Sequence, residues 1–492
     1  MRPLFARISS THTPEALVSR LAGETGVVLL RTGQFESAAA RYSFVTARPF
    51  ATFRSVGSRC ETFSLQGQQI QFGNPWSLLD RMMERYQLLD EPDLPFPLGG
   101  CFGYWGYDLK NFVEPKLSRR ALNDLDLPDC CVGFYDSLVV FDHRLAKTWI
   151  VSTGLEGDGS RSEHRARTQL EFWRSCLREN QSDQMNPGGQ GAVSCAAVAT
   201  SNLTRDEFIS RVERALAYIH AGDIYQVNLS HRLQAQFPGS GWDLFQRLSA
   251  ISPAPYSAYL DLGDFQIASS SPELFLRITG GQIQTRPIKG TRPRSADPTR
   301  DAQLTYELQS SAKELAELVM ITDLLRNDLG KVCEFGSVLV PELVRLERYA
   351  HVQHLVSTVE GRLRPAVTHF EAFASCFPGG SVTGAPKFRA MEIIDELEPN
   401  LRGPYTGALG YLGFNRESQL SIIIRAALCK DGNAYFHTGA GIVAESAPAA
   451  EYDETLAKAA GFLEALQLSH GDESRLITKA GSRKTKPLID AK

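Results

Sequence analysis

In the stretch TRPIKGTRPR, a lysine stands where a strand is expected to end and the chain to turn sharply. Lys289 lies between Pro287 and Gly290, residue types that interrupt regular structure, and directly follows the apolar Ile288. One interpretation is a solvated surface lysine. The other is a nucleophile held against a small substrate, because a lysine amine that is neutral can form a covalent adduct.

Two pairs of acidic residues occur at helical spacing. Glu314 and Glu317 lie three apart on the flank of an apolar stripe, and Glu451 and Glu454 repeat the spacing near the end of the chain. Both pairs have lysines at i,i+4 positions, which is typical of a solvated helix face. The alternative is a Mg²⁺ site, because this ion takes oxygen ligands and one or two carboxylates. The sequence does not show whether the two helices converge.

Two further polar residues lie in runs that look like strands. Arg425, in LSIIIRAAL, is expected inside an apolar strand, where it needs an anion partner to offset the cost of desolvation. A carboxylate that binds it through two hydrogen bonds is the natural partner. His354, in HVQHLVS, is either a satisfied core residue or a functional group.

Three small-residue motifs have alternative interpretations. PGGSVTGAPK (378–387) precedes an expected helix and suits a structural turn or a small-carboxylate site, but its spacing fails the phosphate-loop pattern. HTGAGIVA (437–444) matches the dinucleotide-binding pattern G-x-G-x-x-A, although no helix follows directly, which favours close backbone approach to another ligand. Cys101, in GGCFG, resembles a glutaminase elbow but is interpreted as a buried structural cysteine.

Composition narrows the class of protein. The chain has 492 residues, 43% hydrophobic and 22% charged, with a formal net charge of −4. This balance indicates a globular protein without a nucleic-acid surface. No apolar run approaches the roughly 20 residues of a membrane span. Nine cysteines without C-x-x-C spacing indicate reduced thiols, so we expect a cytoplasmic protein.

The pattern of elements predicts an α+β fold with large antiparallel sheets. Thr204 and Glu207 form a capping box at the start of a helix, and residues 225–237 alternate with period two. Further helices are expected at about 305–329, 368–376, 386–397 and 448–466. The polar stretch 179–203 is expected to be a linker or exposed loop, which separates an N-terminal domain (1–178) from a catalytic domain (204–466), and 467–492 a flexible tail.

Taken in order, the motifs resemble the chorismate-utilising enzymes. They are PIKGTRPR, GDIYQVNLS, SSPELFL, AELVMITDLLRNDLGKV, HVQHLVS, PGGSVTGAPKFRAMEIIDELEP and GAGIVAESAPAAEYDET. The resemblance is dense over 204–466 and thinner before it. It implies antiparallel sheets packed as a sandwich, with helices outside. Lys289 stands where anthranilate synthases carry alanine, and Gln226 where isochorismate and salicylate synthases carry lysine. Together they indicate the aminodeoxychorismate synthase branch.

The resemblance also implies a mechanism. Lys289 adds to C2 of chorismate as the C4 hydroxyl leaves, and ammonia then adds at C4 and expels the lysine. Glu273 matches the general acid for the leaving hydroxyl. Mg²⁺ is the implied cofactor, with Glu317 and Glu451 as ligands, Glu454 beside them and Glu314 less clearly placed.

Other positions match substrate contacts. Tyr405, Arg425, Gly439 and Gly441 correspond to the site for the enolpyruvyl carboxylate. Gln226 is included in the substrate pocket, and Thr291, Ser381 and His354 line its ring side. Ser295, Ala447 and Ala449 depart from the usual motifs but spare these positions.

The resemblance further implies partners. A separate glutamine amidotransferase subunit is expected to supply ammonia, and a separate lyase to act on the product. FESAAARYSF resembles the tryptophan-binding element of the family, with Ser37 as a candidate contact. Two rival functions remain: anthranilate synthase component I, and a regulatory chain that binds tryptophan without turnover.

Overall fold

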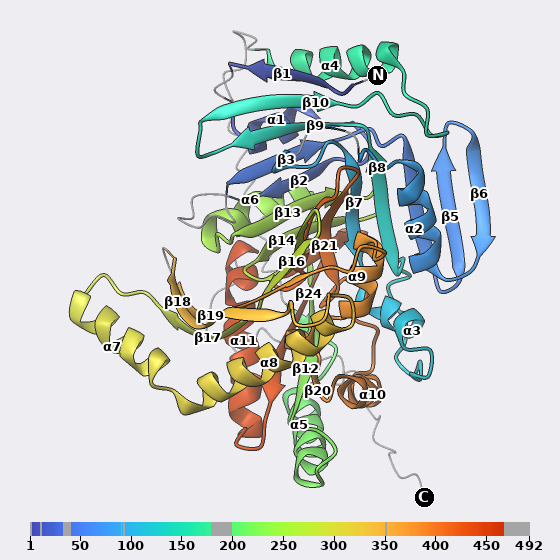
Figure 1. The fold of residues 1–492 in the computed structure, drawn as a ribbon. Coiled ribbons are helices and arrows are strands. Elements are labelled where there is room, and N and C mark those ends of the chain that lie inside the picture. Colours follow the sequence, from blue (N-terminus) through green and yellow to red (C-terminus); the bar gives the residue numbers. More distant parts are fainter. Residues whose placement is uncertain are drawn as a thin grey trace, which may run out of the picture.

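The computed structural model describes residues 2–9, 12–32, 41–89, 91, 94–178, 199–349 and 352–466. Two large antiparallel sheets face each other, and most helices lie on the outside (Figure 1). The predicted α+β sandwich is therefore confirmed. Ser37, most of the expected linker and the expected tail lie outside the described residues, so those predictions stay open.

The first sheet has twelve strands. Their order is β1 (Leu4–Ile8), β10 (Lys147–Ser152), β9 (Ser137–Asp142), β3 (Tyr42–Thr46), β2 (Val28–Arg31), β13 (Tyr256–Asp261), β14 (Gln266–Ser271), β23 (Ala426–Lys430), β24 (Asn433–Ile442), β12 (Gln226–Gln236) and β11 (Thr200–Ser201), with β20 (Gly384–Ala385) also paired to β12.

The second sheet also has twelve strands. Their order is β17 (Ile288–Pro293), β19 (Val352–Arg362), β16 (Gln282–Arg286), β15 (Leu274–Thr279), β22 (Glu417–Ile422), β21 (Ala408–Gly413), β7 (Gly100–Trp105), β8 (Cys130–Tyr135), β4 (Ala51–Val56), β5 (Arg59–Ser64) and β6 (Gly67–Phe72), with β18 (Leu339–Arg348) paired to β19. Each sheet contains strands from both sides of the expected linker. The domain boundaries themselves stay a prediction.

The described helices connect and cover these strands. They are α1 (Pro14–Arg20), α2 (Pro75–Arg85), α3 (Lys110–Val113), α4 (Glu163–Leu177), α5 (Arg205–His220), α6 (Gly241–Ile251), α7 (Pro298–Gln309), α8 (Ala312–Gly330), α9 (His369–Cys376), α10 (Lys387–Leu397) and α11 (Pro448–Ala465). The capping box of Thr204 and Glu207 is confirmed at the start of α5. The single helix expected at 305–329 is wrong: Ser311 caps a new helix, so α7 ends and α8 begins there.

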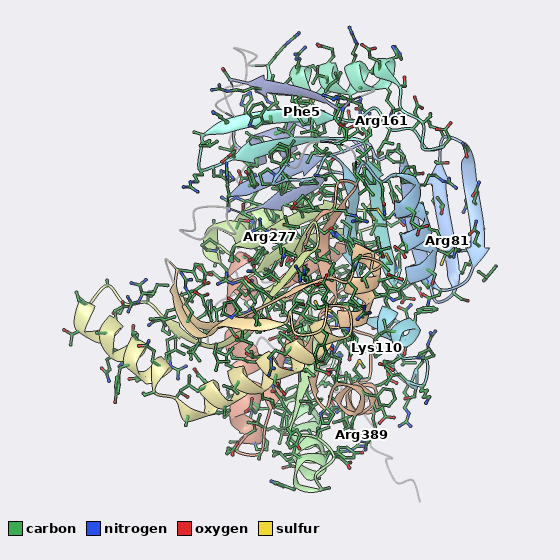
Figure 2. All side chains as sticks on the ribbon, viewed as in Figure 1. Phe5, Arg81, Lys110, Arg161, Arg277 and Arg389 are labelled. Atoms are coloured by element: carbon green, nitrogen blue, oxygen red, sulfur yellow. The ribbon has the colours of Figure 1, made fainter. Side chains whose placement is uncertain are left out.

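Apolar side chains from both sheets form one core cluster. Figure 2 shows the described side chains on the ribbon. Phe44 comes from the first sheet, and Phe134 and Leu409 come from the second. Burying one such side chain contributes about 1.5–3 kcal/mol to folding. Cys101 lies in the same core and is fully buried, which raises the pKa of its thiol. The structural interpretation of this cysteine is therefore confirmed, because a nucleophilic thiol needs the opposite pKa shift.

The chain passes between the two sheets at two neighbouring places. Glu273 lies between β14 and β15, and Arg425 lies between β22 and β23. Backbone hydrogen bonds join the two crossings: Ser270 N donates to the Arg425 carbonyl at 2.9 Å, and Ile422 N donates to the Glu273 carbonyl at 3.2 Å. The two crossings thus place an acidic and a basic side chain in one region of the sandwich.

Candidate active site

Lys289 lies on β17, next to an irregularity in its pairing with β19. Lys289 pairs with Leu355 and Thr291 with His354, so the register shifts at Gly290. Gly290 has a φ of +72°, which favours glycine, and a Cβ there would collide with the Glu314 carboxylate. The bulge therefore depends on glycine, and it sets the direction of the preceding lysine.

The Lys289 side chain is partly buried. Its Nζ donates a hydrogen bond to the carbonyl oxygen of Ser381 at 3.4 Å. Burial lowers the pKa of Lys289 from 10.5, and this outweighs the nearby carboxylates of Glu317 and Glu273, which act to raise it. A lowered pKa enlarges the fraction of neutral amine, which is the nucleophilic form. The solvated-surface interpretation of Lys289 is therefore wrong.

Glu273 lies close enough to Lys289 for their charges to interact, and it is only 5% exposed. Burial raises its pKa from 4.5 to about 7, although a side-chain hydrogen bond with Ser381 and the charge of Lys289 both act to lower it. A carboxyl with such a pKa is protonated often enough near neutral pH to donate a proton. Ser381, on the short helix η3 (Gly380–Val382), thus contacts both groups.

His354 bonds the residue that follows the bulge. Its Nδ1 and the Thr291 hydroxyl lie 2.8 Å apart. Burial, followed by the charge of Arg425, lowers the pKa of His354 to about 4. The ring is therefore neutral at physiological pH and acts through hydrogen bonds. Both interpretations from the sequence hold in part, since His354 is buried and bonded and also lies in the site.

Arg425 does not lie inside a strand, which corrects the expectation from sequence. It occupies the crossing between β22 and β23 with a φ of +54°. Its Nη1 donates to the carbonyl of Lys458 at 2.6 Å, and none of the described carboxylates forms a salt bridge with it. Because a buried guanidinium without a carboxylate is costly, an external anion is the partner that this arrangement favours.

Two glycines of β24 border the same region. A Cβ at Gly439 would lie 3.1 Å from the Tyr405 hydroxyl, and a Cβ at Gly441 would lie 2.7 Å from Nε2 of Gln226. The Gln226 side chain is fully buried, and neither of its amide atoms has a hydrogen-bond partner among the described residues. A buried amide without partners is rare, which favours a ligand at this position.

The acidic pairs of α8 and α11 do converge. Nζ of Lys313 on α8 lies 3.9 Å from Oε1 of Glu451 on α11. The charge of Glu454 on α11 also acts to raise the pKa of Glu317 on α8. Burial raises the pKa of both Glu317 and Glu451. Burial acts to raise the pKa of Glu454, but the 2.6 Å salt bridge with Lys458 and the charges of Lys313 and Lys289 together lower it.

These carboxylates suit a hard cation that keeps some of its water. Among the described residues, no three ligand-type side chains are grouped closely enough to hold a metal by themselves. Mg²⁺ needs only one or two carboxylates, with water and substrate oxygens as the other ligands. The donor set on α8 and α11 therefore fits this ion. Glu314 differs, since it forms a 2.7 Å salt bridge with Arg292.

Lys458 is a site residue that the sequence patterns did not reveal. Its Nζ donates to the Gly439 carbonyl at 2.9 Å, and its own carbonyl accepts the bond from Arg425. The sequence showed it only as the i,i+4 partner of Glu454. The signal was its position one turn beyond Glu454, on the face of α11 that carries the acids.

Neither glycine-rich motif is arranged as a nucleotide-binding loop, and both contribute residues to the site. Lys387 binds Asp328 and donates to the carbonyls of Cys376 and Pro378, at 3.1 and 2.9 Å, so it is committed within the protein. The stretch 378–387 instead carries Ser381 into the site. HTGAG lies within β24 and leads into no helix, which removes the dinucleotide interpretation.

Sequence comparison places these residues in a known family. A family model described as chorismate binding enzyme matches residues 35–464. The chain is 38% identical to anthranilate synthase component 1 of Acetivibrio thermocellus, covering 93% of each chain. It is also 38% identical to aminodeoxychorismate synthase component 1 of Klebsiella aerogenes, covering 94% of this chain and 99% of the relative.

Solved structures agree on the fold. Anthranilate synthase component I from Streptococcus pneumoniae TIGR4 superposes with a TM-score of 0.75 at 31% identity, covering 87% of this chain and 93% of that one. The isochorismate synthase MenF from Escherichia coli gives 0.70 at 18% identity, covering 95% and 94%, which supports the fold alone. No helix in the described part of the chain is both long and apolar enough to cross a membrane.

Proposed function

Because the chain belongs to the chorismate-binding enzymes, we propose that it is component I of an aminodeoxychorismate synthase, which converts chorismate and ammonia to 4-amino-4-deoxychorismate. One observation carries the choice of branch. A partly buried lysine, Lys289, has a lowered pKa and lies beside Glu273, whose pKa is raised. Environments that shift the two pKa values towards neutral pH suit a nucleophile and a general acid.

The first step forms a covalent adduct. The neutral amine of Lys289 adds to C2 of the ring, the double bonds shift and the C4–oxygen bond breaks. Glu273 gives its proton to the departing oxygen, which leaves as water, and then takes the proton released from the lysine nitrogen.

The second step releases the lysine. Ammonia adds at C4, the double bonds shift back and the C2–nitrogen bond breaks. Glu273 returns a proton to the departing amine, and the added nitrogen loses one to solvent. The sum is chorismate plus ammonia giving 4-amino-4-deoxychorismate plus water.

The remaining site residues bind and orient chorismate. Arg425, Tyr405 and the backbone at Gly439 are proposed to hold the enolpyruvyl carboxylate, because the guanidinium has no carboxylate partner among the described residues. Thr291 and His354 face the ring, and the unpartnered amide of Gln226 is available to the substrate.

A divalent cation completes the proposed site. Glu317 and Glu451 would hold Mg²⁺, with Glu454 contributing through water. When bound, the ion would neutralise a substrate carboxylate and favour loss of the hydroxyl.

Ammonia is proposed to come from a glutamine amidotransferase subunit. The relatives carry the name component 1, which suits a two-component synthase. Ammonium salts at high pH should then replace the partner in an assay of this chain alone.

Product analysis tests the proposal. The chain is incubated with chorismate, Mg²⁺ and ammonium, without a lyase, and the products are separated and weighed. We expect 4-amino-4-deoxychorismate, and its loss in Lys289→Ala but not in Lys116→Ala, which changes an exposed lysine. Fluorescent anthranilate would instead establish the rival function, anthranilate synthase component I. A relative of that name is 38% identical to this chain, as is the aminodeoxychorismate synthase relative. Chorismate binding without any turnover would support a regulatory chain.

A further inference from the structure

Tyr405 is stacked face to face on a histidine that the proposed mechanism does not use. The rings of Tyr405 and His437 have centroids 5.1 Å apart and planes inclined by 12°. The Tyr405 hydroxyl lies against Gly439, at the place where the substrate carboxylate is proposed to bind. The contact therefore reaches the substrate pocket through one side chain.

The histidine and the glycine belong to the same strand face. Residues two apart in a strand point to the same side of the sheet, so His437, Gly439 and Gly441 share one face of β24. Gly439 and Gly441 let neighbouring atoms approach this face closely, and His437 occupies the next position with a flat ring. Tyr405 spans from this ring to Gly439.

A cavity lies beside the stacked pair. Tyr405 and His437 both line it, together with Arg232, Ile423 and Tyr435. The backbone of Tyr405 is fixed, since its N–H donates to the Arg402 carbonyl at 3.2 Å. Its ring also has the Arg402 guanidinium carbon 5.7 Å from its centre. The ring of His437 thus favours the orientation that points the hydroxyl at Gly439.

The chemistry of His437 suits support and not catalysis. Burial, followed by the charges of Arg232 and Arg402, lowers its pKa well below 6.5, so the ring is neutral. None of the described residues forms a hydrogen bond with it. Its contribution to the site is the stacking contact, and aromatic pairs of this kind prefer offset parallel or edge-on geometries.

We propose that His437 is a positioning residue for substrate binding: its ring holds Tyr405 with the hydroxyl over Gly439, beside Arg425. This inference rests on the proposed function for the role of Tyr405. It concerns affinity for the substrate carboxylate, so its loss weakens chorismate binding and leaves the chemical step at Lys289 unchanged.

Steady-state kinetics of the full chain with ammonium and Mg²⁺ test the proposal. His437→Ala is expected to raise KM for chorismate roughly three- to tenfold, the range of an aromatic pair, with kcat within about twofold. His437→Phe should restore KM because it keeps the ring, and His437→Leu should not. His220→Ala, at the exposed end of α5, is the matched control.

A double-mutant cycle separates positioning from general damage. If His437 acts through Tyr405, His437→Ala adds little to the KM of Tyr405→Ala. Additive effects, an unchanged KM in His437→Ala, or a loss of kcat alone would overturn the proposal. Should the alanine variant not fold, the comparison of the Phe and Leu variants decides the same question.

Direct titration of chorismate keeps this test apart from that of the proposed function. Binding measured by calorimetry gives the affinity ratio of wild type to variant whatever product is formed. An anthranilate product would therefore refute the proposed function and leave the His437 ratio measurable. If His437→Ala binds chorismate as tightly as wild type does, the positioning role is refuted, even if aminodeoxychorismate is the product.

Discussion

Lys289 and Glu273 converge on one residue, Ser381, which bonds the lysine through its carbonyl and the glutamate through its side chain. The lysine comes from β17, the glutamate from a crossing between sheets, and Ser381 from the stretch before α10. Burial moves the two pKa values in opposite senses, down for the amine and up for the carboxyl. This brings a neutral nucleophile and a protonated acid into the same pH range.

A bell-shaped pH profile follows from this pair. Activity should rise with pH as Lys289 loses its proton, and fall as Glu273 ionises above its pKa of about 7. The profile of kcat/KM in ammonium buffers, corrected for the fraction of free ammonia, measures it. Glu273→Gln should lower kcat roughly 10²- to 10⁴-fold and remove the alkaline limb. An alkaline limb that persists in this variant would assign it to another group.

Glu273 should also make stability depend on pH. Its pKa is about 7 in the folded protein against an ordinary value of 4.5, so the folded state favours the protonated form. The stability from this effect is complete below pH 4.5 and is lost as pH rises through 7, a change of about 3 kcal/mol. Urea unfolding of wild type and Glu273→Gln at pH 4.5 and 8 should show the difference. The same change in unfolding free energy between pH 4.5 and 8 in both proteins would contradict this prediction.

Gly441 should accept a side chain only if the amide of Gln226 moves. A Cβ would approach Nε2 of Gln226 to 2.7 Å, so Gly441→Ala must displace a buried amide at the substrate pocket. Overpacking of this kind costs about 1–3 kcal/mol and should also raise KM. Gly281→Ala is the control, since nothing lies within 4 Å of its Cβ position. Thermal unfolding and KM measured on both variants check the prediction; equal behaviour would refute it.

Arg425 should determine affinity for the substrate. Arg425→Gln removes the charge that lacks a carboxylate partner among the described residues, and a hydrogen bond to a charged group contributes about 1.5–3 kcal/mol. We expect KM for chorismate to rise roughly 10- to 100-fold. Arg326→Gln, whose salt bridge with Asp323 is exposed, is the control. A KM that stays at the wild-type value would place the carboxylate elsewhere.

Mg²⁺ dependence should map to the facing acids of α8 and α11. EDTA is expected to abolish turnover and added Mg²⁺ to restore it. Glu317→Gln should weaken Mg²⁺ binding, measured by calorimetry without substrate, because the ion prefers charged oxygen ligands. Glu307→Gln, on the exposed face of α7, should bind as wild type does. Full activity in EDTA would remove the metal from the account.

The sequence predicted site residues near Lys289 where they belong to a local motif. Gly290 indicated an irregular backbone after the lysine, but the sequence predicted a sharp turn there and not the strand β17, in which Thr291 pairs with His354. Arg425 was misplaced because apolar residues flank it on both sides, as they would in a buried strand. Only the tertiary structure shows that the chain crosses between sheets at that point.

Other features depend on packing that periodicity does not report. One apolar stripe runs through α7 and α8, so a helix break at Ser311 is hidden until the cap is seen. Lys458 was interpreted as a solvated partner of Glu454, and only the contact with Gly439 places it in the site. The convergence of α8 and α11 likewise depends on how the sheets place the two helices, which the sequence pattern does not show.

The intact mass of the enzyme, trapped with chorismate and Mg²⁺ in the absence of ammonia, tests the central claim most directly. The account predicts a species heavier by chorismate less one water, located by peptide mapping at Lys289 and absent from Lys289→Ala. An unmodified wild-type mass, under conditions where added ammonium yields 4-amino-4-deoxychorismate, would contradict it.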